Sequence, residues 1–204
     1  YGLSVVTTSL IALEDVNANN NALYGAYLEG DDTVVNTSFF TANGSLGAVS
    51  EPVGYGLKVV STGTVNLTNI NAADSVGNQL FGADITAAEN VNISDAFFSG
   101  QQSEIFIPCD ETTTYYGYGL NVVTPDDIFL DYVVANYNNL WGANLIGNDV
   151  AVYNSQFNNN ITDSVLFIDD TGLLVNASGY VDIYKTEAKE NRLIGATITA
   201  VGDV

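Results

Sequence analysis

The sequence predicts an all-β protein, a right-handed parallel β-helix of about seven rungs in which each rung is one coil of the chain. Two observations lead to this prediction. A Gly-Leu-x-Val pattern recurs four times, and a Gly-Ala pattern follows each copy. The segments after these glycines alternate apolar and polar residues with the period of two that is typical of strands, whereas helical repeats need a period of 3.6.

The first pattern places a set of apolar residues at fixed distances from its glycine. Leu follows at once, Val stands three residues after the Gly, a β-branched residue stands nine residues after it, and Ala comes seven residues later still. The copies begin at Gly2, Gly56, Gly119 and Gly172. We therefore expect one β-helix domain over residues 1–204, built of double-coil repeats at 1–53, 54–117, 118–170 and 171–204, the last one incomplete.

The second pattern follows the first by 23 residues, or by 26 in the second repeat, where the extra length is expected around Gly77. Its copies begin at Gly25, Gly82, Gly142 and Gly195. Leucine-rich repeats share this period, but their spacing of Leu and Asn does not fit the chain. In the first three copies the pattern continues to an aromatic residue, and we expect an internal aromatic stack of Phe39, Phe98 and Phe157.

Side-chain directions follow from the alternation. In the stretch 55–72, we expect these residues to face inward: Leu57, Val59, Val65, Leu67 and Ile70. Polar residues recur at fixed places and are expected at corners, where amide side chains can satisfy backbone groups and stack from rung to rung. The aligned sets are Asp15 with Asn69, Asn17 with Asn71, Asn19 with Asn136, and Asn36 with Asp95 and Asn154.

Three excursions interrupt the rhythm at 41–55, 99–118 and 158–171. Each contains an apolar core, which makes a plain solvent loop an unsuitable interpretation. The cores are Leu46–Val49, Ile105–Ile107 and Val165–Ile168. Two alternatives stay open: the excursions add a further wall to the coil, or they form a packing strip for another chain.

These repeats resemble the right-handed parallel β-helix repeats of the pectin-lyase-like superfamily. The pattern G-L-x-V, then V-x-L-x-N-[VI]-x-A, then G-A-x-[LI] is more similar to repeats of large bacterial surface and secreted adhesin-type proteins. The resemblance covers nearly the whole chain and implies the fold. It implies little about function, because this fold carries lyases, hydrolases, tailspikes and passive surface stalks.

Charge narrows the range of partners. The chain has 24 Asp and Glu against 4 Lys and Arg, no His, and a formal charge of −20. We expect no nucleic-acid partner and no membrane insertion, because nucleic acids and anionic membranes need a basic surface and no run of 18 apolar residues is present. Polyanionic substrates would be repelled unless divalent cations intervened. The single Cys109 excludes an intramolecular disulfide framework.

No catalytic constellation emerges from the sequence, so we expect no enzyme. Without His, zinc sites and Ser/His or Cys/His catalysis are excluded. Adjacent carboxylates are candidates for glycosidase chemistry, but each pair falls at an expected corner, where the two side chains point apart. The pairs are Asp31–Asp32, Asp126–Asp127 and Asp169–Asp170. We expect no cofactor, and Ca²⁺ at such acidic turns is kept as a minor alternative.

Six Asn-x-Ser/Thr sequons occur, and four are better candidates for N-glycosylation if the protein is glycosylated. Asn66 and Asn92 are expected to point outward from strands, while Asn43 and Asn160 are expected in excursions. Asn36 falls in an expected amide column and is predicted to be buried.

Both ends of the chain carry strand-like sequence without a capping helix, which predicts contact with flanking repeats of a longer chain or end-to-end stacking of copies. The candidate contact residues are Tyr1, Leu3, Val5, Ile198 and Val201. We therefore expect a non-enzymatic extracellular or cell-surface structural protein, either a β-helical stalk or adhesin segment or a head-to-tail fibril subunit.

The alternative function is a β-helix that binds or cleaves carbohydrate. It predicts a groove lined by aromatic and acidic side chains and a glycan partner. The residues expected there are Tyr115, Tyr116, Tyr118, Trp141, Tyr153 and Asp126.

Overall fold

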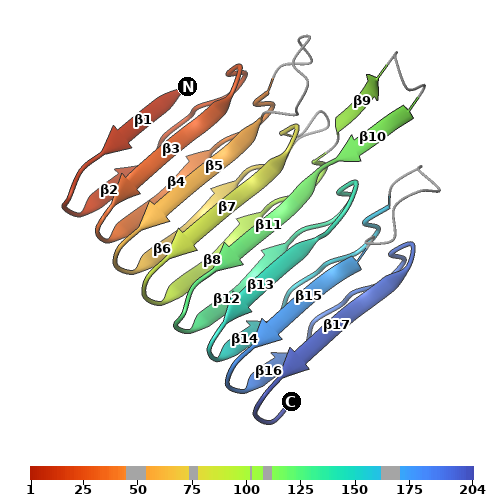
Figure 1. Cartoon of the computed structure of the whole chain (residues 1–204). Coiled ribbons are helices and arrows are strands. Elements are labelled where there is room, and N and C mark those ends of the chain that lie inside the picture. The colour runs from red at the N-terminus through yellow and green to blue at the C-terminus, as the bar shows by residue number, and fades with distance from the viewer. Residues whose placement is uncertain (45–53, 74–77, 102, 108–111, 162–170) are drawn as a thin grey trace.

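The computed structural model describes residues 1–44, 54–73, 78–101, 103–107, 112–161 and 171–204, with the backbone alone for 103–107 and 112–116. These residues form strands and turns, and no helix lies among them. Figure 1 shows two long layers of parallel strands, which we call sheet A and sheet B, together with one short antiparallel pair. The prediction of an all-β fold is confirmed.

Sheet A contains eight strands, all parallel to their neighbours. In spatial order they are β1 (Leu3–Val6), β3 (Tyr24–Gly30), β5 (Tyr55–Ser61), β7 (Phe81–Ala87), β11 (Tyr118–Val123), β13 (Ala143–Gly147), β15 (Thr171–Ala177) and β17 (Ile194–Ala200).

Sheet B contains seven strands, also parallel. In spatial order they are β2 (Ile11–Glu14), β4 (Thr33–Phe39), β6 (Val65–Asn71), β8 (Val91–Phe97), β12 (Ile128–Val134), β14 (Val150–Tyr153) and β16 (Val181–Tyr184). The separate antiparallel pair consists of β9 (Ser103–Ile107) and β10 (Thr112–Tyr116).

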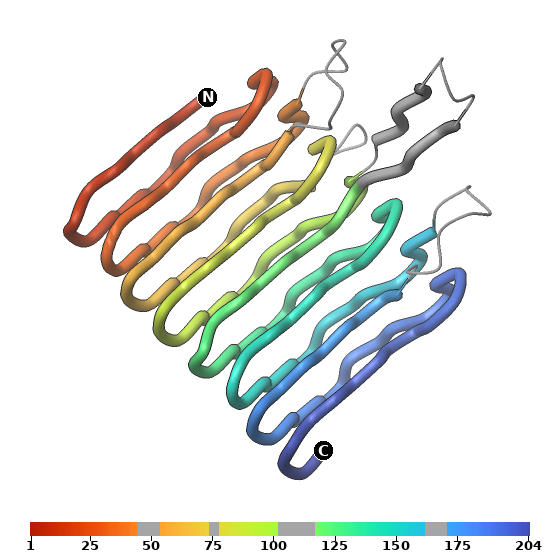
Figure 2. Tube along the Cα trace, in the orientation of Figure 1, coloured from red at the N-terminus to blue at the C-terminus, as the bar shows by residue number. Residues whose placement is uncertain are grey.

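The chain passes repeatedly from one sheet to the other. From β1 to β15, each strand of sheet A is followed by a strand of sheet B, apart from the inserted β9–β10 pair, and the next sheet A strand then pairs beside the previous one. Figure 2 shows the same path repeated from the N-terminal to the C-terminal end. The arrangement is consistent with a parallel β-solenoid. We call a sheet A strand together with the sheet B strand that follows it a rung.

Two apolar columns inside the fold alternate large and small side chains from rung to rung. The sheet A column is Leu3, Ala26, Leu57, Ala83, Leu120, Ala143, Leu173 and Ala196. The second column, just beyond the ends of the sheet B strands, is Ala18, Phe40, Ala72, Phe98, Ala135, Phe157 and Ala188. A rung with Leu in the first column has Ala in the second, and the next rung has Ala and Phe. This compensation keeps the summed side-chain volume of the two columns similar from rung to rung.

Phe39 does not belong to the internal aromatic stack that the sequence predicted. It is 45% exposed, whereas its neighbour Phe40 is 0% exposed. The error is a shift of one residue, because Thr33 and not Val34 pairs with Val65 of β6. Thr33 is buried in an otherwise apolar column, where its β-branched shape replaces that of Val. The buried rings are also separated by alanines, so they do not form an uninterrupted stack.

The strands of sheet B share a bend at one column of residues with positive φ. Their φ angles lie between 46° and 54°. This is a left-handed backbone conformation that residues other than Gly, Asn and Asp rarely adopt. The same shift of one residue affects this column: Thr37, and not Asn36, is equivalent to Asp95, and Asn36 is partly exposed rather than buried. The column is Asp15, Thr37, Asn69, Asp95, Tyr132, Asn154 and Lys185.

Amide side chains form a ladder at the corner that leads from sheet B to sheet A. The sequence predicted amide ladders at corners, but it assigned other residues to them. Asn43 donates from its side-chain nitrogen to Asn78 at 3.0 Å, and Asn138 donates in the same way to Asn160 at 3.0 Å. The ladder is Asn21, Asn43, Asn78, Gln101, Asn138, Asn160 and Asn191. Asn43 and Asn160 are thus fully buried parts of the fold, and their assignment to excursions was wrong.

A second, less buried row of corner residues contains members that the sequence aligned correctly. Asn19 accepts a hydrogen bond from the backbone N–H of Thr41 at 2.7 Å, and Asn136 accepts one from Asn158 at 2.6 Å. The predicted pairing of Asn17 with Asn71 is also present, since both lie in register with Phe39. These contacts tie the turn of one rung to that of the next.

Several predicted features lie outside the described residues. They are the extra length around Gly77, the cores Leu46–Val49 and Val165–Ile168, Cys109, and the pair Asp169–Asp170. The third apolar core, Ile105–Ile107, is the end of β9. In the part of the chain that the structure describes, no helix is long and apolar enough to cross a membrane.

Candidate functional site

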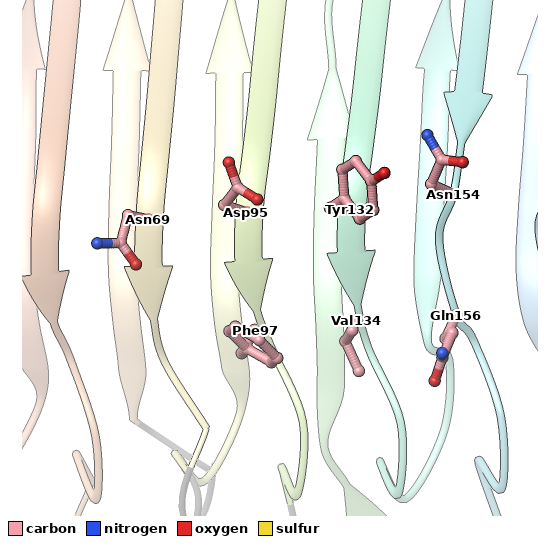
Figure 3. A pocket seen from close by; sticks show the side chains of 7 residues that line it. All are labelled: Asn69, Asp95, Phe97, Tyr132, Val134, Asn154 and Gln156. Atoms are coloured by element: carbon pink, nitrogen blue, oxygen red, sulfur yellow. The ribbon is translucent and has the colours of Figure 1, made fainter.

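An open groove of about 570 Å³ runs across the outer face of sheet B. Figure 3 shows its side chains projecting from the neighbouring strands β6, β8 and β12 and from the residues just after β14. The lining residues are Asn69, Asp95, Phe97, Tyr132, Val134, Asn154 and Gln156. None of them was among the residues for which the sequence predicted a binding role.

The groove follows the bend in the sheet B strands. Its first row of side chains belongs to the positive-φ column, and its second row lies two residues further along each strand, on the same face. Asp95 and Phe97 illustrate the arrangement on β8, as do Tyr132 and Val134 on β12. Strand pairing repeats these positions from rung to rung, so the two rows run along the stacking direction.

Aromatic and polar side chains in the groove are available to a ligand. Phe97 is 46% exposed and Tyr132 is 57% exposed. Within the described residues, the side chains of Asn69, Asp95 and Gln156 make no hydrogen bond. Sequence alone could have indicated the groove only if the bend had been recognised, because the alternating pattern does not distinguish a flat outer face from a hollow one.

Of the residues predicted to form an aromatic and acidic groove, the structure brings Tyr118 and Trp141 together but places Tyr153 and Asp126 elsewhere. Tyr118 and Trp141 lie at the start of sheet A strands, where their ring centroids are 4.9 Å apart. Tyr153 is on β14 of sheet B and donates to Asp182 at 2.6 Å. Asp126 lies in the turn between β11 and β12, at the other end of the sheet A strands from Tyr118. Tyr115 and Tyr116 lie on β10, whose side chains are outside the described part.

Tyr118 and Trp141 instead belong to a row of adjacent rings on the outside of sheet A, in which the other neighbouring pairs are stacked and this last pair is tilted. Adjacent centroids in this row are 4.7 to 5.3 Å apart. The row is Tyr1, Tyr24, Tyr55, Phe81, Tyr118 and Trp141. Burial raises the pKa of Tyr55 to about 12. The sequence carried a signal for this row, because each of these rings immediately precedes the Gly that begins a repeat pattern.

Beside the aromatic row, a charged pair occupies the outer face of sheet A. Lys58 forms an ion pair with Asp84, and their side chains are 23% and 10% exposed. Asn121 donates to the other oxygen of Asp84 at 2.8 Å, and Asn144 donates to Asn121 at 2.8 Å. Lys58 also lies 5.6 Å from the centroid of Tyr55, a cation–π distance. Each oxygen of the Asp84 carboxylate therefore has a partner within the fold.

The acidic turns have a structural role. Asp32 accepts hydrogen bonds from the backbone N–H of Thr64 at 2.8 Å and from its hydroxyl at 2.9 Å. These bonds lower the pKa of Asp32. Asp127 accepts from the backbone of Asp149 at 3.1 Å, one rung further along. Among the described residues, no group of three or more metal-binding side chains is present.

The sequons occupy different environments. The Asn92 side chain is exposed and donates to the partly exposed Asn66 at 3.0 Å, whereas the amides of Asn43 and Asn160 are enclosed in the ladder. The folded chain therefore offers Asn66 and Asn92 to a glycan, and not the other two. Use of any sequon stays a prediction.

The residues predicted to make end-to-end contacts lie on the two outermost strands of sheet A or next to them. Tyr1 is 61% exposed, Val201 is 84% exposed, and Leu3, Val5 and Ile198 are partly buried.

Comparison with known proteins found no matching family model, no similar curated protein and no similar solved structure.

Proposed function

We propose that this chain is a right-handed parallel β-helix of about seven rungs that serves as a non-enzymatic structural column outside the cell. Right-handedness is the rule for parallel strands joined by a crossover. The column would act as a stalk, an adhesin segment or a fibril subunit. Its partners would be flanking rungs of the same chain or copies of itself.

One observation carries this proposal: the interior repeats with a period of two rungs along the whole described length. β17 presents Ala196 and Ile198, and β1 presents Leu3 and Val5. Each internal step from an Ala rung to a Leu rung joins the same residue types, as in the pairing of Ala26 with Leu57. A further rung of the same kind would thus continue the packing of sheet A at either edge.

The surface agrees with an extracellular structural role. A formal charge of −20 favours solubility and opposes lateral aggregation of the exposed sheet faces. Among the described residues, several acidic groups bind turn backbones or take part in two ion pairs, and no group of three or more metal-binding side chains is present. The separation of Tyr118, Asp126 and Tyr153 in the described structure favours this proposal over the carbohydrate-cleaving alternative.

Electron microscopy of the purified chain at high concentration tests the proposal. The expected result is rods or fibres whose width matches one solenoid. A homogeneous population of compact monomers under all conditions would contradict the self-assembling form. For the stalk form, the measurement is the particle length of a chain that carries two copies of residues 1–204 in tandem, which should be about twice that of one copy.

A further inference from the structure

We propose that the groove on sheet B binds a neutral linear polysaccharide that lies along the stacking direction of the rungs. This inference goes beyond the structural role and does not depend on it. The apolar faces of sugar rings would pack on Phe97 and Tyr132. The hydroxyl groups would exchange hydrogen bonds with Asn69, Asp95 and Gln156.

The ligand class follows first from what the groove can offer. Amide side chains both donate and accept, and a carboxylate accepts from two hydroxyl groups, so hydroxyl-rich molecules match them. Exposed rings beside such groups bind molecules with an apolar face. Phe97 and Tyr132 are on adjacent strands and in neighbouring rows, and Figure 3 shows polar side chains on both sides of them. A polymer of sugar rings likewise offers both apolar ring faces and hydroxyl groups along its length.

An extended peptide fits the groove less well. Peptides that add to sheets use free backbone groups at a sheet edge. The groove lies over β6, β8, β12 and β14, and each of these strands is paired on both sides. The floor therefore has no unpaired ladder of backbone groups, and recognition must come from side chains alone.

Charge decides between neutral and anionic polymers. Asp95 is the charged member of the lining, and no Lys or Arg is among the lining residues. The whole chain carries −20. Nucleic acids and polyuronates would be repelled, whereas a neutral polymer would meet no electrostatic repulsion.

The direction of the polymer follows from the register. Equivalent side chains recur at the strand spacing of about 4.8 Å, and the two rows of the groove run parallel to the stacking direction. A chain of sugars in this direction meets a new pair of side chains at each rung. A chain along the strands would leave the groove after one pair.

Isothermal titration of the full chain with cellohexaose, xylohexaose and mannohexaose tests the proposal. The expected result is saturable binding of at least one of them. Tyr132→Ala and Phe97→Ala should each weaken that binding on the order of 10-fold, the loss expected for removal of one stacked ring. Tyr180→Ala is the matched control, because Tyr180 is exposed but lies outside the groove, and it should bind as the unchanged chain does.

Thermal unfolding of each variant shows whether it is folded, which is expected because both rings are exposed. Oligogalacturonate and tetralysine serve as anionic and cationic probes. The proposal is overturned if no neutral hexasaccharide binds saturably, if the two groove variants bind as well as Tyr180→Ala, or if tetralysine alone binds.

Discussion

The side-chain nitrogen of Asn43 donates a hydrogen bond of 3.0 Å to the side-chain oxygen of Asn78, 35 residues away, and both side chains are fully buried. The same oxygen of Asn78 accepts from the backbone N–H of Asn43 at 3.0 Å. The Asn78 nitrogen donates to the carbonyl of Ala72 at 3.0 Å. One side chain thus satisfies polar groups of two successive corners.

Asn78→Ala should lower the free energy of unfolding by about 2–4 kcal/mol, because it removes the acceptor of both the backbone N–H and the side-chain nitrogen of the buried Asn43. Chemical denaturation followed by circular dichroism measures the loss. Asn92→Ala is the control, since Asn92 is exposed, and it should change stability by about 0.5 kcal/mol or less. Equal losses in the two variants would contradict the structural role of the ladder.

Gly56→Ala should prevent normal folding. A Cβ atom at this position would lie 2.5 Å from the carbonyl oxygen of Gly82 and 2.6 Å from the Asn78 side-chain nitrogen, and neither backbone nor ladder can yield. Gly30→Ala is a milder substitution, because the nearest atoms are Ile11 side-chain carbons at 2.8 and 2.9 Å, which can rotate. Soluble yield and the unfolding midpoint should rank the unchanged chain first, Gly30→Ala second and Gly56→Ala last.

Phe40→Ala and Phe39→Ala test the register of sheet B on neighbouring residues. Phe40 fills the interior between the alanines of adjacent rungs, and its truncation should cost about 3–5 kcal/mol. Phe39 points outward, and its truncation should change stability by about 0.5 kcal/mol. Denaturant titration of both variants gives the comparison, and the reverse order would restore the alignment first predicted from the sequence.

The sequence was sufficient to predict the all-β class and the inward positions Leu57, Val59, Val65, Leu67 and Ile70, all of which are buried. The first four follow from the period of two within their strands, whereas Ile70 lies three residues after Leu67, beyond the bend at Asn69. The prediction went wrong where a polar residue took an apolar place, as Thr33 did. A shift of one residue then moved Phe39 and Asn36 to the wrong columns, since successive residues of a strand face opposite sides.

The members of the corner ladder and the groove could not be predicted from the sequence for a different reason. Asn43 and Asn160 stand next to long insertions, so their polarity suggested loops, while their hydrogen bonds join residues 35 and 31 positions apart. The groove depends on positive φ at residues such as Tyr132, and nothing in the type of that residue predicts such a backbone. Register between rungs, which the local sequence does not encode, determines the ladder, and the bend at the positive-φ column determines the groove.

Lys58→Met should lower the free energy of unfolding by about 2 kcal/mol, because the mostly buried Asp84 carboxylate loses its counter-charge. Asp84→Asn combined with Lys58→Met should recover most of that loss, since an amide at position 84 can join the row formed by Asn121 and Asn144. A double-mutant cycle by denaturant titration measures the coupling. Lys189→Met is the control, because the Lys189–Glu187 pair is exposed and should contribute little.

Tyr55 gives the fold a dependence on alkaline pH. Burial raises its folded-state pKa from 10.0 to about 12, so the folded state retains the phenol proton more strongly than the unfolded state does. The stability from this difference is fully present below pH 10, and it is lost as the pH rises toward about 12. Denaturant titrations between pH 9 and about 12 should show this decline, and Tyr55→Phe should make it shallower. Tyr180→Phe, which alters an exposed ring, should leave the slope unchanged; an equal change in both variants would rule out a specific contribution of Tyr55.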